Sequence, residues 1–489
     1  MSGEPSPALR DPRRARWLLW VVAAGVFVAA DDQTSIVTVL PPIINDIGLT
    51  VDDFYRSSWV VNGYLLGYLV ALPLVGRVAD VYGHARVFAA CLGIFMVGSA
   101  LVALAPSFTP LVVFRALQAV GGGGVVPVAM AIVVTELPRG RRVQGLGAIA
   151  AASEAGALLG PLWGGAITEW WGWRTVFWVN LPMTLPIALA AWRLAGNERV
   201  RGRIDWLGAV ILGVALAVLT FALVDDPNER RPLAATGAML IAAAVVAVVW
   251  VWHERRTREP MISLALFRDR RVQAANLASL MVGIGLIVVL ISVPLFANLV
   301  LVESPLEGGL TLMRLTVAVP VGAFLGGWLG TRVGLRGTAI TGMLLAAAGF
   351  MGLRLWDREL SEVLRTAPLL VGGFGFGLVI APLGAAVLQR VDEAHRATAS
   401  AWLTLSRVTG MLVGAALLTS TGLGRFYARV GSLEFGSPEF NRLVAEAQVT
   451  TFREVFLAAV ALMLLAGLVS WWIGRGERDG DVDPWWTVT

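Results

Sequence analysis

Long apolar segments alternate with short polar loops along almost the whole chain. Each apolar segment is close to the roughly 20 residues that a helix needs to cross the hydrocarbon core of a bilayer. Fourteen such segments can be counted, centred near Val26, Gly67, Ile94, Val120, Ala152, Leu185, Val214, Ala244, Val288, Gly322, Leu345, Phe374, Leu412 and Leu462. The pattern predicts an all-α polytopic membrane protein with fourteen transmembrane helices.

Arginine clusters in the loops predict how these helices are oriented. A basic segment precedes the first apolar run. Further clusters follow in every second loop, at residues 77–86, 138–142, 198–203, 253–259 with 267–271, and 332–336. The intervening loops are neutral or acidic, except for the mixed loop at 225–232. Because positively charged loops stay in the cytoplasm, we expect both termini to be cytoplasmic and the membrane to be a bacterial inner (plasma) membrane.

Composition narrows the function classes. The chain is 57% apolar and only 15% charged, too few charges to cover a soluble protein of this length. The net charge of +5 comes from clusters between apolar runs, so it does not indicate nucleic-acid binding. One cysteine and three scattered histidines indicate no metal site. No cofactor is expected, and because no Walker motif is present, a proton gradient is the expected energy source.

The order of the segments suggests two similar halves. The stretch Gly76–Gly83 (GRVADVYG) has a degenerate partner in Gly327–Gly334 (GWLGTRVG), as fusion of two helical repeats produces. The predicted organisation is a cytoplasmic N-terminus (1–16), a six-helix half (17–195), a linker with two extra helices (196–271), a second six-helix half (272–474) and a cytoplasmic tail (475–489). Residues 424–450 form either a loose helical loop or an extension of the neighbouring spans beyond the membrane.

Charged residues inside the apolar segments are the main candidates for function. Each costs roughly 2.5–3.5 kcal/mol at the centre of a membrane helix. Asp31 and Asp32 lie in the first span, Glu154 in the fifth and Arg407 in the penultimate one. A carboxylate that gains and loses an arginine partner can couple a proton to transport. The alternative is that these residues form fixed ion pairs between helices.

Two further features lie in the fourth and fifth spans. Arg115 is placed either to neutralise a carboxylate or to extend its charge to the membrane surface. The fifth span carries Gly156, Gly160 and Gly164 at four-residue spacing, a face that permits close approach of another helix. Pro161 removes a backbone donor and favours a bend there.

Three of these stretches resemble motifs of the major facilitator superfamily. Residues 76–83 resemble its gating loop, which implies that Gly76, Arg77, Asp80 and Gly83 help to latch the cytoplasmic gate. Val81 and His84 depart from the pattern, which has basic residues there. The fourth-span motif linked to proton transfer is matched by Arg115, Gln118 and Gly121, and the fifth-span antiporter motif by Gly156, Gly160, Pro161 and Gly164.

The two additional spans are typical of the fourteen-span drug:proton antiporter family, as are the stretches 170–182, 203–209 and 259–271. Residues 59–77, 377–388 and 406–418 resemble mycobacterial triacylglyceride exporters. That resemblance implies proton coupling or ion pairing by Asp32, Glu154 and Arg407, a gating role for Asp80, and a periplasmic lipoprotein partner. It also favours Asp32 over Asp31.

The sequence therefore favours a proton-coupled secondary transporter, working as a monomer, that exports a triacylglyceride-like lipid from the inner membrane toward the periplasm. The alternative is a multidrug:proton antiporter for amphipathic drugs. An intramembrane enzyme is disfavoured because no span contains a histidine or a nucleophile–base arrangement. A scaffold or receptor would not need charges inside its spans or a repeated half.

Overall fold

The computed structural model describes residues 12–47, 58–194, 204–223, 232–257, 269–301, 305–359, 361–391, 395–418, 422, 425–426, 429 and 440–474. These residues form fourteen long α-helices and two short 3₁₀ segments. The helices of the first half are α1 (Pro12–Ile47), α2 (Ser58–Tyr82), α3 (His84–Ala103), α4 (Phe108–Glu136), α5 (Arg142–Trp171) and α6 (Trp173–Leu194). Next come α7 (Trp206–Leu223) and α8 (Leu233–Arg256). The second half contains α9 (Arg270–Leu299), α10 (Pro305–Arg332), α11 (Leu335–Leu353), α12 (Glu362–Leu388), α13 (Arg396–Leu417) and α15 (Phe440–Val469). The 3₁₀ segments are η3 (Arg139–Arg141) and η7 (Ser470–Ile473).

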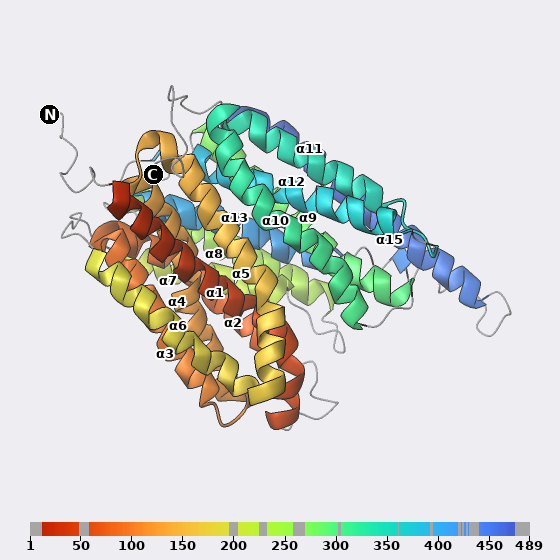
Figure 1. Cartoon of the computed structure of the whole chain (residues 1–489), viewed down its shortest axis with the longest axis horizontal. Coiled ribbons are helices and arrows are strands. Elements are labelled where there is room, and N and C mark those ends of the chain that lie inside the picture. Colours follow the sequence, from red (N-terminus) through yellow and green to blue (C-terminus); the bar gives the residue numbers. More distant parts are fainter. Residues whose placement is uncertain are drawn as a thin grey trace.

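The helices assemble into two bundles that meet along two seams. Helices α1–α6 form one half, and α9–α13 with α15 form the other. The halves contact each other where α5 packs on α10 and where α2 packs on α13. The bundles lie together at the end where α1 begins, here called the terminal end, and diverge toward the opposite end (Figure 1). The predicted all-α fold with fourteen long helices is confirmed for the described residues.

Thirteen of the described helices are long and apolar enough to cross a membrane. The remaining long helix, α13, occupies the predicted span near Leu412 but carries Thr398, Ser400, Thr404 and Arg407. These polar residues lie where α13 meets α2, α4 and the cavity between the halves, so they contact protein rather than lipid. A helix that is shielded in this way can be polar and still lie inside a membrane protein.

The glycine face of the fifth span is used to pack α5 on α1. A Cβ atom on Gly160 would stand 2.4 Å from the backbone oxygen of Asp31, and one on Gly156 would stand 2.3 Å from the backbone oxygen of Phe27. Gly164 lies against Ser35 in the same way. Absence of side chains at these positions therefore lets the two backbones touch, as the four-residue spacing predicted.

The internal repeat corresponds to two equivalent turns. Gly83 separates α2 from α3 with φ of 97°, and Gly334 separates α10 from α11 with φ of 94°. Residues other than glycine rarely adopt positive φ values of this kind. The two related sequence stretches thus end in the same sharp turn at the terminal end of each half.

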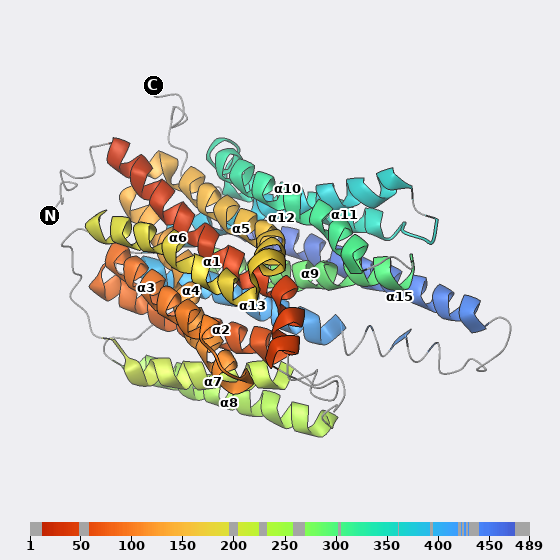
Figure 2. The same ribbon diagram turned by 60° about the horizontal axis from the view of Figure 1, so that its bottom comes forward.

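The linker helices α7 and α8 pack along one side of the bundle, over the seam between α2 and α13 (Figure 2). Trp250 of α8 stacks on Trp402 of α13, with ring centroids 5.8 Å apart. Asp205 accepts a hydrogen bond from the backbone N–H of Gly208 and contacts the ring of His253, which fixes the start of α7 to the end of α8. The linker therefore touches both halves.

About half of the predicted extension at 424–450 lies outside the described residues. Most of its described part is the beginning of α15, which projects past the neighbouring helices (Figure 1). Arg453 pairs with Asp357, just after the end of α11, so the turns of α15 before Arg453 lie beyond α11. Residues 1–11 of the predicted N-terminus (1–16) and the predicted tail (475–489) also lie outside the described residues, and residues 12–16 belong to α1.

The α1–α5 contact gives a stability prediction. Gly160→Ala should lower the stability of the protein by about 1–3 kcal/mol, because the new Cβ would overlap the α1 backbone. Gly165→Ala is the matched control on the same helix, since its Cβ would come no closer than 3.9 Å to Thr38. Thermal unfolding of the purified variants measures the difference. Equal melting temperatures for both variants would contradict the close contact.

Candidate transport cavity and its ionic networks

A buried polar cluster lies in the first half, at the meeting point of α1, α3, α4 and α6. Arg115 Nη1 donates to Asp32 Oδ2 at 2.9 Å and to Gln118 Oε1 at 2.6 Å. The other carboxylate oxygen of Asp32 accepts from Gln118 at 3.0 Å and from Asn180 at 2.7 Å. Ser99 accepts from the same two amide groups. The Asp32 charge is thus held by one cation and two amides in a site closed to solvent.

Sequence reasoning identified part of this cluster. Asp32, Arg115 and Gln118 were candidates, and the structure brings them together; Arg115 is fully buried rather than extended toward the membrane surface. Ser99 and Asn180 were missed, because a neutral polar residue in an apolar span is a weaker signal than a charge. Gly121, from the same motif, packs α4 against the backbone of α3 at Phe95.

Aromatic rings surround the cation of this cluster. The guanidinium of Arg115 lies 4.5 Å from the ring centre of Tyr64 and 5.5 Å from that of Phe177. Ring faces attract a cation in a site without water. Asp31 occupies the neighbouring helix face, where its backbone lies against α5, so Asp32 is the member of the pair that enters the cluster.

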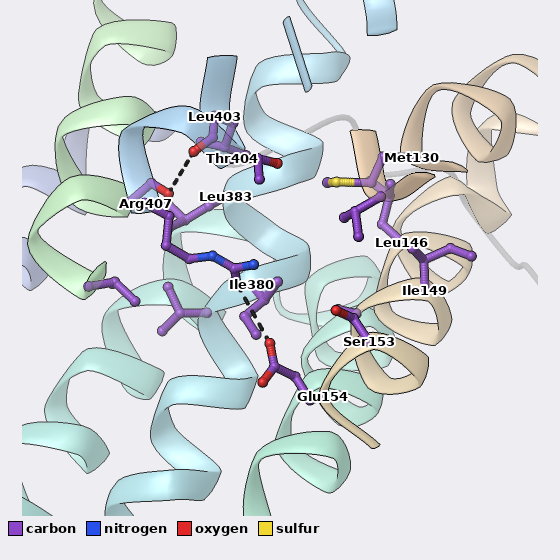
Figure 3. Close-up of a pocket in the computed structure, with 15 residues that line it drawn as sticks. Met130, Leu146, Ile149, Ser153, Glu154, Ile380, Leu383, Leu403, Thr404 and Arg407 are labelled. Carbon is purple, nitrogen blue, oxygen red and sulfur yellow. Dashed lines mark hydrogen bonds and ion pairs between the residues drawn. The ribbon is translucent and has the colours of Figure 1, made fainter. Parts of the chain in front are cut away.

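A second polar centre lies in a cavity between the two halves (Figure 3). Arg407 of α13 and Glu154 of α5 approach to 3.6 Å, and each side chain is about one-fifth exposed. The walls are mostly apolar and include Met130, Leu146 and Ile380. The cavity is partly open to the outside. Two charges in such walls attract each other more strongly than in water.

The three residues predicted to share one ionic role therefore divide between two places. Glu154 and Arg407 come together across the interface of the halves, whereas the partners of Asp32 lie on α3, α4 and α6. Asp32 belongs to the interior of one half and does not touch the cavity pair. Among the described residues, no group of three or more His, Cys, Asp or Glu side chains is placed to hold a metal ion.

A third centre joins the halves at the terminal end. Asp80 of α2 accepts hydrogen bonds from the backbone N–H groups of Ala397 and Thr398, at 2.8 and 2.9 Å, and from the Thr398 hydroxyl at 2.6 Å. These N–H groups belong to the first turn of α13, where a helix has no internal acceptors. His395, the residue before α13, provides no side-chain cap. Asp80 therefore caps a helix of the opposite half.

Neighbouring contacts strengthen this closure. Gly76 lies against Thr398, where a Cβ would approach within 2.9 Å, and Arg77 is buried beside it. Gly83 provides the turn that follows. His84, which departs from the family pattern, contacts Asp80 at 3.1 Å. Every hydrogen bond described between the halves lies on the terminal side of the Glu154–Arg407 pair.

The two helical halves surround an apolar cavity, and contacts between them close it at one end. This is the architecture of a multi-pass secondary membrane transporter. The chain belongs to the Major Facilitator Superfamily, whose family model matches residues 22–415. It is accordingly a transporter and not an enzyme. The predicted resemblance to this superfamily is confirmed.

Relatives with named substrates cover most of the chain. A triacylglyceride transporter of Mycolicibacterium smegmatis is 33% identical over 95% of this chain and 88% of its own length. One from Mycolicibacterium hassiacum is 37% identical over 86% of this chain and 82% of its own length. The resemblance to mycobacterial triacylglyceride transporters is thus also confirmed.

Solved structures support the fold. A human organic anion transporter superposes with a TM-score of 0.64 at 18% identity, covering 94% of this chain and all of that one. A proton:xylose symporter superposes with a TM-score of 0.60 at 15% identity, covering 94% and 95% of the two chains. At such low identity these likenesses concern the fold alone.

The buried cluster gives a prediction about charge balance. Arg115→Met should destabilise the protein by about 3–5 kcal/mol, because Asp32 would remain buried without its cation. The double variant Asp32→Asn/Arg115→Met should recover a large part of that loss, since no buried charge is left. Unfolding in detergent provides the measurement. A double variant as unstable as the sum of its two single variants would contradict the pairing.

The closure at the terminal end gives a prediction about conformation. Asp80→Asn removes the charge that holds the first turn of α13, and loss of charge-assisted hydrogen bonds of this kind is worth about 2 kcal/mol. The separated state should then gain population by about 30-fold. Maleimide labelling of Ser400→Cys, which is buried between the halves, reports the change.

The control for this experiment is Asp357→Asn, which removes an exposed ion pair within the second half. Equal labelling rates in the Asp80 variant and in the parent would show that Asp80 does not hold the halves together.

Proposed function

We propose that this protein exports a triacylglyceride-like lipid from the inner membrane of a bacterium, driven by protons. The observation that carries the proposal is the Glu154–Arg407 pair inside an otherwise apolar cavity between the halves. The names of the relatives supply the substrate class. The basic loops supply the orientation, with cytoplasmic termini.

The pair offers a simple way to couple a proton to movement. Glu154 belongs to α5 of one half and Arg407 to α13 of the other, so their attraction draws the halves together around the cavity. A proton on Glu154 abolishes that attraction and leaves Arg407 without its partner. Proton binding and the ion pair are therefore mutually exclusive, and each favours a different arrangement of the halves.

The closed end fits one state of an alternating-access cycle. With cytoplasmic termini, the Asp80 cap closes the cytoplasmic side, and the halves diverge toward the periplasm (Figure 1). In this state a lipid in the cavity would leave outward. Proton entry from the outside to Glu154 would loosen the pair and permit the return to an inward-facing state. A lipoprotein acceptor in the periplasm and a monomeric state remain part of the proposal.

The residues that line the cavity favour a neutral lipid over the substrates of a drug:proton antiporter. An amphipathic cation needs an unpaired carboxylate, whereas the carboxylate of Glu154 already faces Arg407. The walls otherwise present methyl and methylene groups, with few polar atoms for a drug scaffold. A neutral lipid needs little more than such walls.

The experiment that tests the proposal deletes the gene in its host and complements it with the wild type or with Glu154→Gln. The variant is almost the same size and lacks only the ionisable group. We expect triacylglycerides to accumulate in the inner membrane of the deletion strain, and only the wild type to restore their level in the outer envelope. Lipid extraction from the separated membranes provides the measurement.

Glu446→Gln is the control, because Glu446 forms an exposed ion pair with Arg442 far from the cavity, and it should complement fully. Unchanged lipids in the deletion strain, together with lost resistance to amphipathic drugs, would contradict lipid export and favour the drug antiporter. Full complementation by Glu154→Gln at normal abundance would contradict proton coupling through Glu154.

A further inference from the structure

The polar side chains of the cavity differ in whether they already donate a hydrogen bond within the protein. Five polar residues line it: Ser153, Glu154, Ser279, Thr404 and Arg407. The Ser279 hydroxyl donates to the backbone oxygen of Leu403 at 3.2 Å, and the Thr404 hydroxyl donates to that of Ser400 at 3.1 Å. A hydroxyl has a single hydrogen to donate. Ser279 and Thr404 therefore have none left for a ligand.

Ser153 is different. Its side chain lies on α5 beside Glu154 and is directed into the cavity (Figure 3). Among the described residues its hydroxyl has no hydrogen-bond partner. A serine within a helix usually donates back to its own helix or points to water. Ser153 makes no such bond to its own helix, so its O–H faces the partly open cavity as a donor in a mostly apolar wall.

Arg407 adds further donors to the same space. A guanidinium has five N–H groups, and the approach of Arg407 Nη1 to Glu154 Oε1, at 3.6 Å, is longer than a hydrogen bond. No hydrogen bond of Arg407 to another described residue accompanies it. The Arg407 charge is thus balanced by Glu154, while its N–H groups are still available. The cavity is electrically balanced and offers unused donors.

This combination fits a particular ligand chemistry. The ester groups of a neutral acylglycerol contain carbonyl oxygens that accept hydrogen bonds and have no hydrogen to donate. The acyl chains match the methyl-lined walls. We propose that the Ser153 hydroxyl, together with an N–H group of Arg407, binds an ester carbonyl of such a lipid, and that Ser153 determines preference for esters. This inference rests on the proposed lipid transport and names the chemical group that the site recognises.

The test compares two lipids that differ only in the carbonyls. Trioleoylglycerol has three ester carbonyls, and the corresponding trioleyl glyceryl ether has none. Binding of each to the purified full-length protein in detergent is measured by displacement of a fluorescent triacylglyceride. We expect the wild type to prefer the ester by about 3- to 10-fold, the range that one or two neutral hydrogen bonds provide.

The variants identify the donor. Ser153→Ala should bring the ester-to-ether ratio close to one, and Ser153→Thr, which keeps a hydroxyl, should restore most of the preference. Ser279→Ala removes the same atoms from the same cavity, but its hydroxyl is already committed to Leu403, so the ratio should stay at the wild-type value. Melting temperatures of the three variants verify that each one folds.

Two results would overturn the inference while lipid transport stands: equal binding of ester and ether by the wild type, or equal loss of preference in Ser153→Ala and Ser279→Ala. A wild-type protein that binds neither lipid would overturn the proposed substrate and this inference together.

Discussion

The free energy of a charge held away from water governs how this protein is built. An ionised side chain inside a low-dielectric bundle is tolerated when an opposite charge or several hydrogen-bond donors face it. Asp32 meets that condition within one half, through Arg115, Gln118 and Asn180. Glu154 meets it only across the interface, through Arg407. The first arrangement makes a half rigid, and the second makes the energy of the molecule depend on how the halves are placed.

The contacts between helices are of two kinds, close backbone packing and polar bonds. Within the first half, α1 and α5 touch through bare backbone at Gly156 and Gly160, which leaves no room for relative movement. Between the halves, Asp80 accepts three hydrogen bonds at the terminal end. A few polar bonds can break and re-form without disturbing a packed core. The halves also pack closely at the terminal end, where Gly147 of α5 meets the backbone of Gly327 of α10. The closed state therefore combines this packing with polar bonds that can break and re-form.

Much of this was predictable, because membrane helices are encoded locally. Apolar length predicted the fourteen helices, and glycine spacing predicted that another helix packs closely on the fifth span, although not that this helix is α1. Residues such as Asp32 and Arg115 stood out because charges inside apolar spans are costly. Which charges meet was not predictable, since Arg115 could face any of several carboxylates. Asn180 and Ser99 were missed because a neutral polar residue in a span is a weak signal until its neighbours are known. His84 looked like a departure from a motif, yet it contacts Asp80 itself.

The cap that Asp80 places on α13 has a consequence for hydration. When the halves part at the terminal end, the N–H groups of Ala397 and Thr398 lose their acceptor, and no side chain at His395 replaces it. Buried amides do not remain unsatisfied, so water must enter as the halves separate. Separation of the halves therefore requires water to enter this end of the protein. The equilibrium between the two states therefore depends on the activity of water. Solutes that are excluded from the protein surface will favour the closed state, in which Asp80 accepts the hydrogen bonds of the first turn of α13.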